Sequence, residues 1–467
     1  MDVPHHVFRE YDIRGIVGRE LTPALILEVG RAYGGLLRTM ADDAGSDGES
    51  LRVVLGQDNR PTSSALADAL VQGLNEVGVH VLDLGVVPTP VTWWAEKTQP
   101  RVHGALQVTG SHNPVGWNGV KMTALGRSLF GDQVQELRTR VTSGHPPAPE
   151  PSSRGDRIDH PTLDAYVDDV VGRIGPVEGV RMVVDCGNGT GAVVAERLLE
   201  RLGVEVIPLY CESDGTFPNH HPDPTVDEYL TDMIELVRKE GAQVGVAFDG
   251  DADRIGMVDD RGRILRGDVL LLLYGLDLLE RKGPGQLLLY DVKCSQLLPE
   301  VYDAAGGRSL MWKTGHSLMK EKMRETGAPL AGELSGHICF GGEDYLGIDD
   351  ALYAACRLAR MIADRSEPIS TTVDGFPTYV STPEIRLEVT EEVKTLVVAA
   401  AAEHFSATHD VVDVDGVRIL FGDGWALIRA SNTQPVLVLR FEARNEERLA
   451  EIRGQVERWL RGQGIHG

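Results

Sequence analysis

The chain has 467 residues, of which 42% are hydrophobic and 25% are charged, and its formal net charge is −24. A chain of this length accommodates roughly three or four domains, and the composition is that of a globular rather than a disordered protein. Because such an acidic surface repels nucleic acid and anionic membranes, we expect neither as a partner.

The N-terminal stretch MDVPHHVFREYDIRG is polar and lacks the apolar core of a signal peptide. The longest apolar run, 269–280, contains Asp277 and is too short to span a membrane, so we expect a core helix there. The five cysteines include no CxxC pair, which is typical of buried free thiols in a reducing compartment. We therefore expect a cytoplasmic protein, and the lack of a long heptad pattern favours a monomer.

Up to about residue 371 the chain repeats one pattern, in which an apolar run is followed by an amphipathic helical segment and a second apolar run. The repeats begin at residues 52–56, 180–185 and 286–291. This alternation predicts βαβ units whose parallel strands are buried on both faces. We expect three related α/β domains, each ending in a polar turn at the carboxyl end of a strand, where ligands bind in such sheets.

The pattern changes after residue 371. Strand-like segments and helical patterns over 390–404 and 445–462 predict an α+β domain with a mostly antiparallel sheet. A stretch rich in Pro and Ser at 143–156 indicates a linker. We place the four domains at residues 1–156, 157–260, 261–370 and 371–467.

The segment FDGDADR carries Asp249, Asp251 and Asp253 at alternate positions. Three carboxylates so close repel one another unless a cation holds them together, and a small set of oxygen ligands suits Mg²⁺. The alternatives are a solvated acidic turn, a helix N-cap, a Ca²⁺ loop and an aspartate-based phosphatase site. An EF-hand is disfavoured because the chain returns to an apolar strand at Ile255, and Arg254 adds a cation beside the predicted metal.

The turn TGSHNP places Ser111 directly after the apolar run GALQV. A serine hydroxyl is a weak nucleophile until a base or a charge activates it, and a phosphoserine needs counter-charge, which a metal on the aspartates would supply. His112 is a candidate base or orienting group, and Lys121 is a candidate cation for the same phosphate. Alone, such a motif is more often a plain turn, so the prediction depends on its companions.

The segment RASNTQP resembles a phosphate cradle. Arg429 can bind two phosphate oxygens at once, and the neighbouring Ser431, Asn432 and Thr433 offer short donors and exposed backbone N–H groups. Runs of these residue types are usually plain turns, and the arginine at the end of an apolar strand favours the phosphate site only modestly.

The segment GELSGH places Glu333, Ser335 and His337 on a Gly-flanked loop, where the carboxylate can accept hydrogen bonds from two neighbouring sugar hydroxyls. Lys293 and His316 lie on two other loops of the same repeat. Each of these signals is weak when taken alone.

Two further segments remain ambiguous. FREYDIRG contains Tyr11 and Arg14 and is either an ordinary salt-bridged terminus or an arm that enters a site. The turn CGNGTG lacks the GxGxxG spacing, and Glu205 stands at the wrong place for a ribose contact, so we reject a dinucleotide site.

FREYDIRG, TGSHNP, FDGDADR, GELSGH and RASNTQP occur in this order in one chain, and together they resemble the α-D-phosphohexomutase superfamily, in particular its bacterial phosphomannomutase/phosphoglucomutase branch. The resemblance spans about residues 8–443 and implies four domains around a central cleft, the first three sharing an α/β topology with mixed sheets. Two positions depart from the pattern: Ala252 replaces a glycine that many members have, and Gln57 in GQDNRPTS replaces a basic residue.

The resemblance implies a role for each motif, with Ser111 as the phosphoserine. The implied metal ligands for Mg²⁺ are Ser111, Asp249, Asp251 and Asp253. The implied catalytic residues are Ser111, Lys121, Arg254, His316 and Arg14. The implied substrate-binding residues are Tyr11, Lys293, Glu333, Ser335, His337, Arg429, Ser431, Asn432 and Thr433. Lys121 is the first candidate for general acid–base work because it is close to Ser111 in sequence.

The implied enzyme is an intramolecular phosphotransferase that interconverts hexose 1-phosphate and hexose 6-phosphate through a hexose 1,6-bisphosphate, with glucose 1,6-bisphosphate as intermediate or activator. The GELSGH loop favours mannose and glucose as the sugars. The alternatives are a phosphoglucosamine mutase, a Mg²⁺-dependent sugar phosphatase with an aspartate nucleophile, and a sugar-phosphate-binding protein without turnover.

Overall fold

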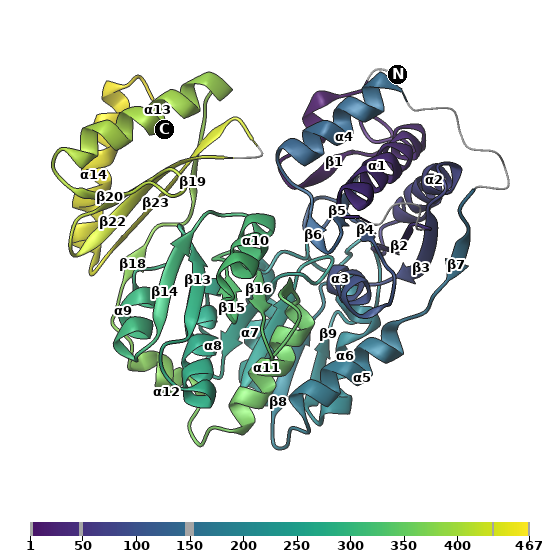
Figure 1. Cartoon of the computed structure of the whole chain (residues 1–467). Coiled ribbons are helices and arrows are strands. Elements are labelled where there is room, and N and C mark those ends of the chain that lie inside the picture. The colour runs from purple at the N-terminus through teal and green to yellow at the C-terminus, as the bar shows by residue number, and fades with distance from the viewer. Residues whose placement is uncertain (1–2, 46–49, 145–153, 432–433, 466–467) are drawn as a thin grey trace. The chain divides into compact units, whose positions relative to one another are not determined.

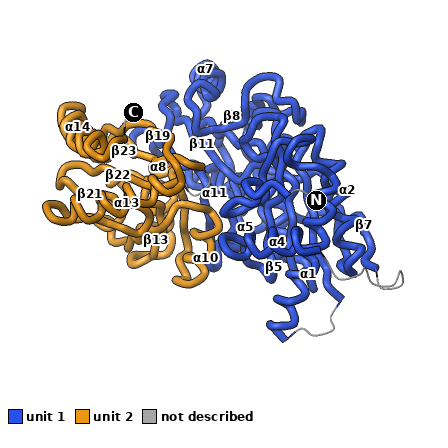
Figure 2. Tube along the Cα trace, turned by 90° about the horizontal axis from the view of Figure 1, so that it is seen from above, with its two compact units in different colours: residues 1–266, 335–371 blue, residues 267–334, 372–467 orange. Residues whose placement is uncertain are grey.

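The computed structural model describes residues 3–45, 50–144, 154–431 and 434–465 (Figure 1). The chain divides into two compact units (Figure 2), residues 1–266 with 335–371 and residues 267–334 with 372–467. Each unit is therefore built from two separate stretches of sequence. Most of the predicted linker at 143–156 lies outside the described residues.

The first sheet of the first unit is mixed. Its strands are β1 (Asp12–Ile16), β2 (Arg52–Gln57), β3 (His80–Val86), β4 (Gly104–Val108), β5 (Trp117–Ala124), β6 (Arg127–Ser128) and β7 (Arg157–Asp159). Their order is β1-β5-β4-β2-β3-β7, with β6 beside β5. Strand β5 runs antiparallel to β1 and β4, whereas β2, β3, β4 and β7 are parallel.

Helices cover this first sheet. Helices α1 (Pro23–Asp43), α2 (Ser63–Glu76) and α4 (Asp132–Ser143) share one hydrophobic core with its strands, and α3 (Thr89–Thr98) packs on β2 and β4. Helix α1 begins where it does because Thr22 accepts a hydrogen bond from the Leu25 N–H and a proline follows the cap.

The second sheet of the first unit has the order β12-β11-β10-β8-β9. Its strands are β8 (Arg181–Asp185), β9 (Glu205–Leu209), β10 (Val244–Phe248), β11 (Ile255–Asp259) and β12 (Ile264–Leu265). Strands β8, β9 and β10 are parallel, and β11 is antiparallel to both of its neighbours. The helical segments of this region are η3 (Thr190–Val193), η4 (Asp227–Leu230), α5 (Leu163–Ile174), α6 (Ala195–Leu202) and α7 (Thr231–Glu240), while η1 (His5–Val7) precedes the first sheet.

The stretch that returns to the first unit contains the antiparallel pair β16 (Ile338–Phe340) and β17 (Ile348–Asp349), followed by α11 (Ala351–Ala363). Helix α11 packs on α5, α6 and β11. Helix α12 (Ile369–Asp374) spans the point at which the chain passes to the second unit.

The second unit also contains a parallel and an antiparallel region. Strand β13 (Leu287–Asp291) runs parallel to β14 (Arg308–Trp312) and β15 (Leu330–Gly332), with helices α8 (Gly267–Lys282), α9 (Leu297–Ala304) and α10 (His316–Thr326). The antiparallel sheet comprises β18 (Val380–Ser381), β19 (Ile385–Glu388), β20 (Asp410–Val412), β21 (Val417–Leu420), β22 (Gly424–Ala430) and β23 (Val436–Ala443). Helices α13 (Glu391–Ser406) and α14 (Glu446–Gly462) share its hydrophobic core and lie on one face of it (Figure 1).

These elements confirm the predicted fold class, including the α/β repeats with mixed sheets and the antiparallel C-terminal sheet. The apolar run 269–280 is a core helix, as predicted, because it lies within α8. No helix within the described ranges is both long and apolar enough to cross a membrane. The prediction that all cysteines are buried is wrong at Cys211, which is half-exposed, although all five are free thiols.

Candidate active site

Ser111 lies in the turn after β4, with its side chain buried in the first unit. Its backbone is left-handed, with φ 48°, and its N–H donates to Thr109 Oγ1 at 2.8 Å. Its hydroxyl donates to Asp249 Oδ2 at 2.9 Å and lies 3.2 Å from His112 Nδ1. The two motifs TGSHNP and FDGDADR, well separated in sequence, are therefore in direct contact.

The three aspartates of FDGDADR occupy the connection from β10 to β11 and are fully buried. One carboxylate oxygen from each lies within 4.8 Å of the others. Lys121 Nζ, from β5, is 2.7 Å from Asp251 Oδ2 and also binds Asp253. Lys121 is therefore buried against the aspartates rather than exposed on its strand.

The three aspartates of this cluster differ in how far a positive charge offsets their own. Burial and the neighbouring Asp251 and Asp253 raise the pKa of Asp249 well above its usual range. Burial opposes ionisation of Asp251 as well, but contact with Lys121 outweighs it and lowers the pKa of that carboxyl. Burial likewise disfavours the Lys121 ammonium, but the aspartates raise its pKa. One ammonium therefore contacts two of the three carboxylates and leaves the cluster short of positive charge.

The donor set fits a divalent cation. Oδ1 of Asp251 and Oδ1 of Asp253 are buried and accept no hydrogen bond from the described part of the chain. Buried carboxylate oxygens without a donor are costly unless a cation binds them. Oxygen ligands supplied only by carboxylates and a hydroxyl are those that Mg²⁺ prefers.

The backbones of the serine turn and of the aspartate turn approach each other closely. A Cβ at Gly250 would lie 2.5 Å from the Ser111 carbonyl oxygen, so only glycine allows this approach. Ala252 has a left-handed backbone, with φ 57°, and is fully buried. The methyl group of this residue is therefore accommodated in a conformation that glycine adopts more readily.

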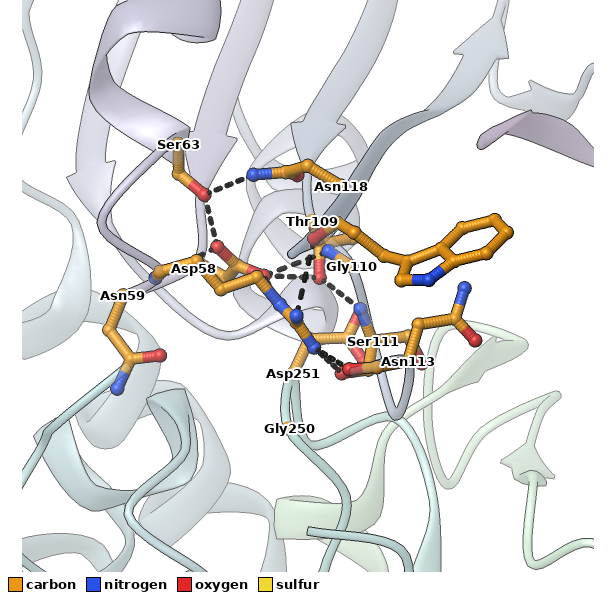
Figure 3. A network of polar contacts seen from close by, with 12 residues as sticks. Asp58, Asn59, Ser63, Thr109, Gly110, Ser111, Asn113, Asn118, Gly250 and Asp251 are labelled. Carbon is orange, nitrogen blue, oxygen red and sulfur yellow. Dashed lines mark hydrogen bonds and ion pairs between the residues drawn. The ribbon is translucent and has the colours of Figure 1, made fainter. Parts of the chain in front are cut away.

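Arg60 and Asp58, which the sequence analysis did not single out, fix the serine turn. The Arg60 guanidinium donates to the carbonyl oxygens of Ser111 at 2.7 Å and Asn113 at 2.6 Å, and it also reaches those of Pro114 and Trp117. Asp58 binds the guanidinium and accepts from Thr109 Oγ1 and Gly110 N–H, both at 2.9 Å (Figure 3). The loop GQDNRPTS thus holds the turn through its Asp and Arg, whereas its departure at Gln57 lies at the end of β2.

Thr89 is a second contact that the sequence did not reveal. Its hydroxyl donates to Asp251 Oδ2, and its N–H donates to the Asp251 carbonyl oxygen at 2.9 Å. The residue begins α3, and nothing in its local sequence distinguishes it from an ordinary first residue of a helix.

Further predicted residues surround this cluster. Arg14, on β1, donates from Nη1 to the Gly110 carbonyl oxygen at 2.9 Å. Arg254 Nε donates to His337 Nε2 at 3.0 Å, and His337 Nδ1 lies 3.3 Å from Asp349 Oδ2. The structure therefore joins Arg14, Arg254 and His337 to the surroundings of the serine turn and the aspartates.

Burial, together with Arg254 and Arg14, lowers the pKa of His112 well below its usual range, which favours a neutral imidazole. Tyr11 lies directly before β1 and is half-buried, and Ser335 is half-buried in the first unit.

Other predicted residues belong to the second unit. Lys293 follows β13, and its ammonium is 2.8 Å from Glu384 Oε1. Glu333 follows β15 and accepts from the Gly315 N–H at 3.0 Å, beside His316 at the start of α10. The residues of GELSGH are divided, because Glu333 belongs to the second unit whereas Ser335 and His337 belong to the first.

Two of the predicted cations of the second unit, Lys293 and Arg429, are paired with carboxylates. Lys293 lowers the pKa of Glu384 to about 2 despite partial burial. Burial disfavours the charged form of Lys293, but Glu384 and Asp291 raise its pKa. Neither Glu384 nor Asp415, the partner of Arg429, was predicted from the sequence.

Arg429 lies near the end of β22, and its Nε donates to Asp415 Oδ2 at 2.6 Å. The same carboxylate oxygen accepts from the Thr314 N–H at 2.9 Å. Ser431 is buried, and its carbonyl oxygen accepts from Lys394 Nζ at 2.7 Å. Asn432 and Thr433 lie outside the described residues.

Comparison with known proteins shows similarity over nearly the whole chain. Four segments match the phosphoglucomutase/phosphomannomutase alpha/beta/alpha domains I, II and III and C-terminal domain, at residues 5–147, 164–262, 266–379 and 384–458. The chain is 42% identical to a phosphomannomutase/phosphoglucomutase of Pseudomonas putida, over 97% of this chain and 94% of the relative. It is 38% identical to a phosphoglucomutase of Neisseria gonorrhoeae, over 97% of this chain and 96% of the relative.

A crystal structure of a phosphoglucomutase/phosphomannomutase family protein from Burkholderia thailandensis has a TM-score of 0.90, 40% identity and coverage of 98% of both chains. More distant similarity, with a TM-score of 0.57 and 16% identity over 90% of this chain and 78% of the other, extends to an Aspergillus fumigatus N-acetylphosphoglucosamine mutase in complex with GlcNAc-6P and magnesium. At that identity the similarity concerns the fold alone.

Proposed function

We propose, because this chain belongs to the phosphoglucomutase/phosphomannomutase family, that Ser111 is the residue that carries the transferable phosphoryl group. The chain is a phosphohexomutase, which interconverts hexose 1-phosphates and hexose 6-phosphates. The observation that carries the proposal is the contact at 2.9 Å between the Ser111 hydroxyl and Asp249, within a buried cluster of three carboxylates.

In the proposed reaction, the free hydroxyl at C1 or C6 of a hexose monophosphate attacks the phosphorus of phosphorylated Ser111. The new P–O bond forms as the bond to Ser111 Oγ breaks, and a hexose 1,6-bisphosphate results. Transfer of the opposite phosphoryl group back to Ser111 then leaves the isomeric monophosphate and restores the phosphoserine. Mannose and glucose phosphates are the proposed substrates, and glucose 1,6-bisphosphate is the proposed activator.

The chain's own residues supply position and charge for this transfer. Arg60 and Asp58 hold the serine turn in place, so that the hydroxyl oxygen stays aimed at the aspartates. Lys121 brings an ammonium against the same cluster and is our first candidate for moving the proton of the attacking hydroxyl, ahead of Arg14 and His316. We place Arg254 among the catalytic residues, fixed by His337.

The carboxylates of Asp249, Asp251 and Asp253, together with Ser111, would hold Mg²⁺. When bound, the ion supplies positive charge that offsets the charge of the phosphoryl group during transfer. The support is the orphaned oxygens of Asp251 and Asp253 and the shortage of positive charge in the cluster.

We assign substrate binding to loops of both units. Arg429 and Ser431, with Asn432 and Thr433, are proposed to bind the phosphate that does not react; the contact of Arg429 with Asp415 fixes the plane of its guanidinium. Glu333 and Ser335 are proposed to bind sugar hydroxyls. The remaining proposed substrate-binding residues are Tyr11, Lys293 and His337.

We propose that the protein acts as a cytoplasmic monomer on small sugar phosphates, without nucleic-acid or membrane partners. The formal net charge of −24 supports the absence of polyanionic partners.

Intact-mass measurement of the purified protein tests the phosphoserine. We expect an adduct of about 80 Da, mapped to Ser111, after incubation with glucose 1,6-bisphosphate, and neither adduct nor mutase activity in Ser111→Ala. Ser143→Ala, an exposed serine of the same unit, should retain both. A Ser111→Ala protein with full activity would exclude the mechanism. An adduct on an aspartate instead would identify a phosphatase.

The same protein assayed with mannose 1-phosphate, glucose 1-phosphate and glucosamine 1-phosphate decides the substrate. We expect turnover of the first two. Preference for the third would identify a phosphoglucosamine mutase instead.

A further inference from the structure

Two of the five cysteines, Cys186 and Cys211, lie in contact in the second sheet of the first unit. Their sulfur atoms are 3.3 Å apart and both are free thiols. Cys186 directly follows β8, and Cys211 lies two residues beyond β9. Neither residue takes part in the proposed phosphoryl transfer.

The backbone brings the two side chains together. Strands β8 and β9 are parallel neighbours with Asp185 opposite Leu209, so both cysteines leave the same edge of the sheet. The chain between them is kinked at Tyr210, whose backbone is left-handed with φ 51°. Beyond this kink the Cys211 sulfur returns to β8 and lies 3.3 Å from the Val184 carbonyl oxygen.

A disulfide requires a sulfur–sulfur distance of about 2.05 Å and Cα atoms within roughly 7 Å. The Cys186 and Cys211 sulfurs are 3.3 Å apart and follow two neighbouring strands. The sulfurs therefore need to approach by only a little over one ångström to form a bond.

The two thiols differ in exposure and in acidity. Cys186 is buried, whereas Cys211 is half-exposed and is therefore the more accessible of the two to a dissolved oxidant. The hydrogen bond between the sulfurs lowers the pKa of Cys211, while the same contact and burial raise the pKa of Cys186. We therefore expect Cys211 to be the thiol that reacts with the oxidant and Cys186 to be the thiol that then closes the disulfide.

We propose that Cys186 and Cys211 form a reversible modification site, which a hydroperoxide closes to a disulfide and a reducing thiol reopens. The Cys211 sulfur attacks one peroxide oxygen, so that the S–O bond forms as the O–O bond breaks, and the released oxygen leaves as water or an alcohol. The Cys186 sulfur then attacks Cys211, forming the S–S bond, while hydroxide leaves and takes up the Cys186 proton as water. Two thiols are oxidised and one peroxide is reduced.

The site connects to the metal-binding turn through the loop that Cys186 begins. Thr190, four residues further on, donates from both its N–H and its hydroxyl to the Gly250 carbonyl oxygen, at 2.9 and 3.0 Å. A Cβ at Gly189 would lie 2.8 Å from the same oxygen. Because Gly250 stands between Asp249 and Asp251, a shift of this loop on disulfide formation moves the proposed metal ligands. The predicted effect on turnover rests on the proposed function, whereas formation of the disulfide does not.

Treatment of the purified full-length protein with hydrogen peroxide tests the site. We expect a mass loss of about 2 Da and a peptide pair linked through Cys186 and Cys211, with Cys294, Cys339 and Cys356 still open to alkylation after unfolding. Turnover should fall roughly tenfold, since misplacement of catalytic groups by about 1 Å has effects of this size or larger, and dithiothreitol should restore both mass and turnover.

Single variants separate the two roles. Cys211→Ser should show no mass loss and no reversible inactivation, while Cys186→Ser should accumulate a sulfenic acid on Cys211 that dimedone traps. Failure to recover the linked peptide, or a disulfide between other cysteines, would overturn the site. A Cys186–Cys211 disulfide with unchanged turnover would overturn the coupling to Gly250.

Discussion

The aspartate cluster of the first unit and the predicted substrate-binding cations of the second unit differ in how their charges are balanced. In the first unit, the carboxylates of three buried aspartates lie within 4.8 Å of one another and a single lysine contacts two of them, so the cluster is short of positive charge. In the second unit, Lys293 and Arg429 each have a carboxylate partner, Glu384 and Asp415. The difference supports our proposals that the first cluster binds a cation and that Lys293 and Arg429 bind an anionic substrate.

The largest effect on activity is expected from a substitution within the aspartate cluster, where three carboxylates repel one another. Asp249→Asn should lower kcat by about 10²- to 10³-fold, the usual cost of removing one group that stabilises transition-state charge. Because burial and two aspartates raise the pKa of Asp249, the neutral amide should also raise the melting temperature of the metal-free protein. Steady-state kinetics and thermal unfolding in EDTA measure the two effects. Asp159→Asn, at an exposed position of β7, should change neither, and a less stable Asp249→Asn protein would contradict the proposed repulsion.

The ion pair between Lys293 and Glu384 should stabilise the protein, so its removal should lower stability, whereas Asp249→Asn should raise it. The pKa of Glu384 is lowered from 4.5 to about 2, so its stabilising contribution is present above pH 4.5 and is lost as the pH falls towards 2. A shift of this size corresponds to roughly 3 kcal/mol. Glu384→Gln should therefore be less stable by about that amount at neutral pH, and the difference from wild type should vanish near pH 2 in urea unfolding curves. Glu388→Gln, at the exposed last residue of β19, the strand that Glu384 directly precedes, should follow the wild-type profile.

Replacing an arginine by lysine in each unit distinguishes a structural role from a role in substrate binding. Arg60 holds the serine turn of the first unit, and Arg429 of the second unit is proposed to bind the substrate's phosphate. Arg60→Lys leaves buried carbonyl oxygens without donors and should cost about 2–3 kcal/mol of unfolding free energy. Arg429→Lys should raise KM about tenfold while changing stability by less than about 1 kcal/mol. Urea unfolding and kinetics on both proteins provide the comparison. If Arg429→Lys lost stability without a change in KM, its proposed phosphate contact would be excluded.

The smallest effect concerns the backbone of the metal-binding turn. Ala252 has a left-handed backbone, which is strained for alanine and not for glycine. Ala252→Gly should therefore stabilise the protein by about 0.5 kcal/mol, because the strain relieved in the folded state outweighs the conformational entropy that glycine adds to the unfolded chain. Ala355→Gly, within helix α11, should instead lose about 1 kcal/mol or more. The midpoints of urea unfolding measure both. A destabilised Ala252→Gly protein would show that the methyl group contributes packing that outweighs the strain.

Much of this molecule is determined by its local sequence. The apolar runs and amphipathic helices predict the α/β repeats and the C-terminal sheet, because strand and helix periods are encoded by neighbouring residues. TGSHNP and FDGDADR likewise specify turns with their own chemistry. The tertiary structure decided which of these turns meet: the contact of Ser111 with Asp249, the burial of Lys121 between two aspartates, and the hold of Arg60 on the serine turn. The sequence did not predict the contacts of Thr89 and Glu384 or the pairing of Cys186 with Cys211. The packing of separate strands and loops brings the partners of these residues together. The distance between such residues depends on the order of strands in the sheet and not on their spacing along the chain.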